Sequence, residues 1–145
     1  LAASGLERLD LVQLHAVDRK VPIAESVGAL VRLAERGLIR HIGLCNVDVA
    51  QIAAARAVTP IVSVQNAWSL LDKAAFTKGV VDACRGWGIA CIAHSPLGGH
   101  KRGGRLAKDA VLSAIAADRG TSPEGVALAH LMDAGFVPIP GASRP

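Results

Sequence analysis

The sequence predicts an α/β protein made of consecutive parallel β/α units in one sheet, and three observations lead to this prediction. Short apolar runs of strand length alternate with amphipathic segments of helix length. Small and aliphatic residues dominate, with 15 glycines and only 3% aromatic residues. Polar residues repeatedly follow the strand-like runs, where such strands would leave the core. We therefore expect about five strands, with a covering helix between successive strands and right-handed crossovers.

Composition narrows the class of protein further. The chain has 145 residues, the size of one domain, and 51% of them are hydrophobic, which is ample for a core. No apolar run approaches the ~20 residues that cross a bilayer. Because the net charge of +4 is spread along the chain, we expect neither a nucleic-acid nor a membrane partner. Three cysteines without CxxC spacing predict reduced thiols in a cytoplasmic protein, and we expect no metal site.

The first predicted strand lies in the segment LDLVQLHAVD, residues 9–18. Its nearly continuous apolar pattern predicts a strand covered on both faces, and His15 follows at its carboxyl end. A histidine at a strand exit can be a general acid or base, a ligand, or a hydrogen-bonded polar group without further function. An amphipathic helix should follow, starting at Pro22 and stopping at Gly37.

Three strands and two helices are expected in the middle of the chain. The strands are Ile39–Leu44, Ile61–Val64 and Ile89–Ala93, and the helices cover 48–58 and 75–87. Asp48 should cap the first of these helices, because its carboxylate can accept bonds from the free N–H groups of the first turn. The three strand exits carry polar or thiol side chains: Cys45 and Asn46, Gln65 and Asn66, and His94 and Ser95.

The last third of the chain should contain a loop, two helices and a final strand. The segment 97–105, LGGHKRGGR, is rich in glycine and basic residues, and we interpret it as a solvated loop. Helices are expected at 107–118 and 122–134, the second with Ser122 as its cap. The final strand is Phe136–Ile139.

With these strand exits in place, the sequence resembles the aldo-keto reductase family, whose members are (β/α)8 barrels that reduce aldehydes and ketones with NADPH. Five segments match in family order, each at a strand exit: LDLVQLH at 9–15, GLIRHIGLCN at 37–46, TPIVSVQNAWSLLD at 59–72, HSPLGG at 94–99 and VPIPGASRP at 137–145. The resemblance implies a partial (β/α)8 TIM barrel of about five strands, from about the fourth to the eighth barrel strand.

The resemblance also implies roles for residues at the strand exits. His15 matches the histidine that orients and polarises the substrate carbonyl. Asn46 and Gln65 match residues that hold the nicotinamide carboxamide, and Cys45 stands where the family more often has Ser or Thr. His94 takes the place of an aromatic residue that stacks on the nicotinamide, and an imidazole would stack less well.

Two further segments match the family's phosphate-binding positions. The loop over the cofactor's pyrophosphate corresponds to Ser95, Pro96, Leu97 and Gly98. The site for the 2′-phosphate corresponds to Gly141, Ser143 and Arg144. Because a guanidinium can fork onto a phosphate, this second match favours NADP(H) over NAD(H) as the cofactor.

The family's proton donor is a tyrosine tuned by an aspartate and a lysine, all on the first strands of the barrel. This chain contains no tyrosine and begins with Leu1. We therefore expect a fragment of an NADP(H)-dependent reductase of small carbonyl compounds that lacks the half carrying these groups.

Two other interpretations stay open. The chain could be a non-catalytic NADP-binding or interaction module, or a half-barrel that uses His15 or His94 as a base in another reaction. Because open sheet edges favour association, we also expect a homodimer or pairing with a complementary half-barrel.

Overall fold

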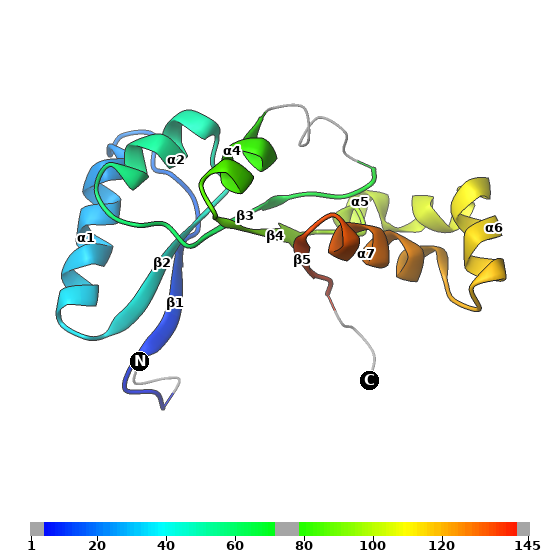
Figure 1. The fold of residues 1–145 in the computed structure, drawn as a ribbon, viewed down its shortest axis with the longest axis horizontal. Coiled ribbons are helices and arrows are strands. Elements are labelled where there is room, and N and C mark those ends of the chain that lie inside the picture. The colour runs from blue at the N-terminus through cyan, green and yellow to red at the C-terminus, as the bar shows by residue number, and fades with distance from the viewer. Residues whose placement is uncertain (1–4, 72–78, 142–145) are drawn as a thin grey trace. The chain divides into compact units, whose positions relative to one another are not determined.

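The computed structural model describes residues 5–71 and 79–141, which form alternating strands and helices (Figure 1). The elements are β1 (Leu9–Leu14), α1 (Ile23–Glu35), β2 (Ile39–Cys45), α2 (Val49–Arg56), β3 (Ser63–Ala67), α4 (Val80–Gly86), β4 (Ala90–His94), α5 (Gly99–Arg102), the 3-10 helix η2 (Gly103–Lys108), α6 (Ala110–Asp118), α7 (Pro123–Asp133) and β5 (Phe136–Ile139). The order of strands in the sheet is β1-β2-β3-β4-β5, which confirms the predicted α/β fold.

The chain divides into two compact units. Unit 1 comprises Leu1–Gln65 and Gly79–Ala90, and unit 2 comprises Asn66–Lys78 and Cys91–Pro145. Strands β1, β2 and β3 pair in parallel in unit 1, and β4 and β5 pair in parallel in unit 2. In the described part of the chain, no helix is long and apolar enough to cross a membrane.

The core of unit 1 lies between its strands and the helices α1, α2 and α4, which cover one face of them (Figure 1). Leu14, Leu44 and Val64 lie side by side across β1, β2 and β3, and Leu44 and Val64 are fully buried. Val27 of α1 and Ile52 of α2 are fully buried as well. Because successive side chains point to opposite faces of a sheet, the neighbouring row, residues 13, 43 and 63, faces away from these helices.

Side-chain caps set the starts of three helices. Asp48 accepts a bond from the Gln51 backbone amide at 2.8 Å, and the Gln51 side chain accepts one from Asp48 in return. Ser122 caps α7, as predicted. Asp109 caps α6, so that helix begins three residues later than the sequence indicated.

The largest difference from the sequence prediction concerns residues 97–105. This segment was expected to be a loop, but α5 and η2 occupy most of it. Gly98 and Gly99, at φ +92° and +65°, turn the chain out of β4 before the helical turns begin. The run of glycines therefore marks a tight turn rather than a long irregular connection.

The first strand also differs from expectation. It was predicted to be covered on both faces, yet Leu11 is 40% exposed. β1 lies at the edge of the sheet, so Leu11 and the other side chains on its face have a neighbouring strand on one side only in the described part of the chain. Strand β3 begins at Ser63, two residues later than predicted, and α4 begins at Val80, the start predicted at 75 lying outside the described residues.

Candidate functional site

Asn46 connects three neighbouring strands of unit 1, through its side chain on one side and its backbone amide on the other. Its Nδ2 donates to the backbone oxygen of His15 at 3.0 Å and contacts Cys45 Sγ at 3.2 Å. Its backbone amide donates to the backbone oxygen of Gln65, also at 3.0 Å. The structure thus brings together four residues named from the sequence. His15 and Asn46 directly follow β1 and β2, Cys45 ends β2, and Gln65 lies within β3, which continues to Ala67, three residues beyond the predicted end.

The backbone of Asn46 adopts an unusual conformation. Its φ of +56° lies in the left-handed region, which asparagine tolerates better than most residues other than glycine. This conformation turns the chain from β2 toward the cap residue Asp48 and helix α2. Position 46 therefore favours asparagine for both its backbone and its side chain.

Cys45 lies beneath this junction and is 1% exposed. Burial raises the pKa of the Cys45 thiol above its ordinary value, and a hydrogen bond from the Asn46 backbone opposes this in part. The group therefore remains a neutral thiol at neutral pH. Because the thiolate is the nucleophile in cysteine chemistry, Cys45 is better suited to packing and weak hydrogen bonding than to attack on a substrate.

Side-chain hydrogen bonds link Gln65, Gln13 and Ser63 across β1 and β3. Gln65 Nε2 donates to Gln13 Oε1, and Gln13 Nε2 donates to Ser63 Oγ at 3.1 Å. Ser63 is only 3% exposed. Neither Gln13 nor Ser63 was named from the sequence as a site residue. Both are polar residues within strands, Gln13 in β1 and Ser63 in β3.

In unit 2, the candidate residues follow β4 in a tight turn. Ser95 has φ +52°, and its Oγ lies 3.3 Å from Nδ1 of His94. Gly98 has φ +92°, and a Cβ there would lie 2.8 Å from Leu71 Cδ1 and 2.9 Å from Arg102 Cβ. Only glycine fits this position without a shift of its neighbours.

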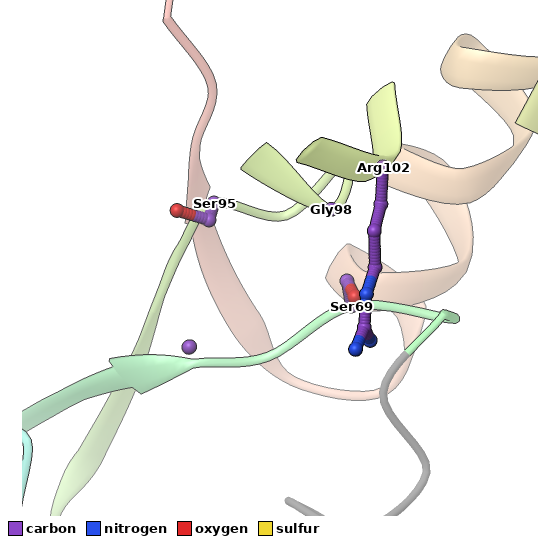
Figure 2. Close-up of a pocket in the computed structure, with 5 residues that line it drawn as sticks. Ser69, Ser95, Gly98 and Arg102 are labelled. Atoms are coloured by element: carbon purple, nitrogen blue, oxygen red, sulfur yellow. The ribbon is translucent and has the colours of Figure 1, made fainter. Parts of the chain in front are cut away.

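A hollow of about 210 Å³ lies beside this turn, lined by Ala67, Ser69, Ser95, Gly98 and Arg102 (Figure 2). The Arg102 side chain extends from α5 toward the segment that carries Ser69 (Figure 2). Its Nη1 donates to the backbone oxygen of Leu71 at 3.4 Å. Arg102 is exposed, as expected for a basic residue of this segment, but it also gives the hollow a guanidinium.

A second hollow, of about 370 Å³, lies between the ends of β4 and β5. Ser95, Pro96, Leu97, Gly99, Ile139, Pro140 and Gly141 line it. The two hollows therefore contain all the described residues that the sequence assigned to phosphate binding. Ser143 and Arg144 lie outside the described residues. Glycine-rich backbone and a nearby guanidinium are suited to binding anionic oxygens.

Comparison with known proteins identifies relatives over the whole chain. The family model described as "Aldo/keto reductase family" matches residues 1–145. A Schizosaccharomyces pombe protein named as an uncharacterized oxidoreductase is 36% identical, over 97% of this chain and 45% of its own length. A Glycine max protein named "Probable aldo-keto reductase 1" is 31% identical, over 97% of this chain and 50% of its own length. The chain thus spans about half the length of these relatives.

Solved structures give the same result for the fold. A thermostable aldo-keto reductase in complex with the inhibitor epalrestat matches with a TM-score of 0.86 and 28% identity, over 95% of this chain and 51% of its own. A Klebsiella pneumoniae aldo-keto reductase in complex with NADPH matches with a TM-score of 0.83 and 25% identity, over 95% of this chain and 50% of its own. These matches confirm the predicted partial TIM barrel.

Proposed function

This chain belongs to the aldo/keto reductase family, and from that membership we propose that it is the NADP(H)-binding part of an enzyme that reduces small aldehydes or ketones. In this proposal residues 1–145 form one partial reductase domain. The protein is located in the cytoplasm, because thiols such as its three buried, free cysteines stay reduced there. The observation that carries the proposal is the junction at Asn46, which joins the strand ends bearing His15 and Gln65. The NADPH complex of the Klebsiella pneumoniae relative supports the choice of cofactor.

The strand ends of unit 1 suit the nicotinamide end of the cofactor. Its carboxamide has two N–H donors and one oxygen acceptor, and the amides of Asn46 and Gln65 offer both kinds of partner. NADPH would supply the hydride. In this proposal His15, at the end of β1, donates a hydrogen bond to the substrate's carbonyl oxygen as negative charge develops there.

The turn after β4 in unit 2 suits the cofactor's phosphates. The turn at residues 95–98 would bind the pyrophosphate through the backbone N–H groups of Ser95 and Leu97, since the N–H of Gly98 donates to the Ser95 oxygen at 2.9 Å. The Arg102 guanidinium beside the hollow would pair with the pyrophosphate's charge. Glycine at position 98 lets the turn pack closely against Leu71 and Arg102, which places the Arg102 side chain beside the hollow. The family resemblance assigns 2′-phosphate binding to Gly141, Ser143 and Arg144 and nicotinamide contact to His94, and we keep these roles as part of the proposal.

Fluorescence titration of the 145-residue chain with NADPH and with NADH tests this proposal. We expect saturable NADPH binding, at least about tenfold tighter than NADH binding because of the charged hydrogen bonds to the 2′-phosphate. Gln65→Leu should weaken the binding of both cofactors. His130→Gln changes an exposed residue of α7 and serves as the control, whose affinities should not change. If neither cofactor binds to the folded chain, the proposal is wrong.

A non-catalytic NADP-binding or interaction module is the second candidate, because these 145 residues match the family's cofactor-binding positions more fully than its catalytic ones. Loss of a general acid commonly lowers rates by ~10²–10⁴. Tight NADPH binding without aldehyde reduction by this chain would support the module. Recovery of turnover when a tyrosine-bearing partner segment is added would support the reductase.

We also propose that this chain forms a homodimer or pairs with a complementary half-barrel. Leu11 of the edge strand β1 is 40% exposed, and an unpaired edge with apolar side chains is a template for association. Light scattering after size exclusion should give a mass of about twice 14.9 kDa, or one that changes with concentration. A single species at 14.9 kDa across all concentrations would contradict this expectation.

A further inference from the structure

Gln13 lies in a position to orient Gln65, which is not its neighbour in sequence. Gln13 Oε1 accepts from Gln65 Nε2, and Gln13 Nε2 donates to Ser63 Oγ. The Gln13 amide is therefore held at both ends, by side chains of a strand two positions away in the sheet. Because Gln13 and Gln65 are half-buried and Ser63 is 3% exposed, unmade hydrogen bonds in this row would be destabilising.

The intervening strand β2 leaves room for this connection only because residue 43 is glycine. Gln13, Gly43 and Ser63 share one row across β1, β2 and β3. A Cβ on Gly43 would lie 2.3 Å from Ser63 Oγ and 3.0 Å from Gln13 Cγ. The Gln13 side chain therefore crosses above Gly43 to reach β3, and its bond to Ser63 depends on the absence of a side chain at position 43.

This arrangement fixes which end of the Gln65 side-chain amide points toward Gln13. A glutamine amide has a donor end, Nε2, and an acceptor end, Oε1, which can exchange places when the group flips. A bond from Gln65 Nε2 to Gln13 turns the Oε1 of Gln65 away from Gln13. A ligand at the strand ends would then meet an acceptor at this position.

We propose that Gln13 is a positioning residue that presents Gln65 Oε1 as the acceptor for the N–H group of the nicotinamide carboxamide. This inference rests on the proposed NADP(H) function and adds the reason for one contact within it. It predicts selectivity for a carboxamide over a group of similar shape that has no N–H. Such a group is the acetyl substituent of 3-acetylpyridine adenine dinucleotide phosphate.

The test compares the affinities of the unchanged chain and two variants for the reduced forms of NADP and of this acetyl analogue. The unchanged chain should bind NADPH about 3- to 10-fold more tightly, the usual worth of one hydrogen bond. In Gln13→Met, which keeps the side-chain length but has no acceptor oxygen, the ratio should fall to about 1–2. In Gln13→Glu the ratio should persist, because the carboxylate can accept from both Gln65 Nε2 and the Ser63 hydroxyl.

The Glu variant makes the test specific. A merely structural role for Gln13 would lower the affinities for both cofactors equally and leave their ratio unchanged in Gln13→Met. Loss of the ratio in Gln13→Glu, whose carboxylate still accepts from Gln65 Nε2, would mean that the orientation of Gln65 Oε1 does not set the ratio, and the inference would be overturned. Failure of the unchanged chain to bind either cofactor would instead contradict the proposed function.

A cofactor-free measurement keeps the inference testable in that case. The side-chain N–H signals of Gln65 in nitrogen-15 NMR spectra should exchange slowly with solvent in the unchanged chain and in Gln13→Glu. In Gln13→Met they should exchange at least about tenfold faster, as expected when a hydrogen bond worth about 1.4 kcal/mol is lost. Equal exchange in all three proteins would overturn the placement of Gln65 Nε2 against Gln13.

Discussion

Replacing Gly43 with alanine should lower the free energy of unfolding by about 1–3 kcal/mol. The new methyl group would lie 2.3 Å from Ser63 Oγ and 3.1 Å from the Ser63 backbone oxygen, so both the side chain and strand β3 would have to move. The movement would also break the bond between Gln13 and Ser63. Urea denaturation, monitored by circular dichroism, measures this change in the free energy of unfolding.

Gly28→Ala is the matched control for this substitution. Gly28 lies within α1, and a Cβ there would meet only Arg32 Nη1, at 3.9 Å. Alanine inside a helix is more favourable than glycine by roughly 0.5–1 kcal/mol, so this variant should be more stable than the unchanged chain. If the two substitutions shift stability in the same direction, the close packing assigned to Gly43 is wrong.

Asn46→Ala should both destabilise the chain and weaken NADPH binding. Alanine removes the bond to the His15 backbone oxygen, and it adopts the left-handed backbone conformation at a penalty of roughly 1–2 kcal/mol. Together with the lost hydrogen bond, the unfolding free energy should fall by about 2–3 kcal/mol. We expect the NADPH affinity to fall at least about tenfold, because the strand ends are no longer tied together.

Asn46→Gly separates these two contributions. Glycine adopts φ +56° freely, so this variant should lose only the side-chain bonds and recover most of the lost stability. Its NADPH affinity should stay as low as that of Asn46→Ala. Wild-type affinity in Asn46→Gly would show that the asparagine side chain has no part in cofactor binding.

Local patterns were sufficient to predict most of the fold. β5 spans Phe136–Ile139 as expected, and Asp48 and Ser122 cap their helices, because an N-cap bond involves residues only three apart. The burial of β1 could not be predicted, since the same apolar run serves an edge strand or a central one. The helical turns of residues 99–108 were missed because clustered glycines resemble a loop.

The candidate site was predictable where it follows the strand ends. His15, Asn46 and Gln65 each follow or end a recognisable apolar run, and parallel strands bring such positions to one edge of the sheet. The link from Gln13 to Ser63 was missed, because it joins residues 50 positions apart and depends on the register of three strands. A glycine within a strand is the sequence signal that could have indicated it.

Titration of the nitrogen-15-labelled chain with NADPH tests the central claim, that this chain carries the cofactor site, most directly. We predict saturable shifts of the side-chain amide signals of Asn46 and Gln65 and of the backbone amide signals of Ser95, Leu97 and Gly98. Signals of exposed helix residues such as Met132 should stay in place. Absence of saturable shifts at Asn46 and Gln65, or shifts confined to residues away from the strand ends, would contradict the account.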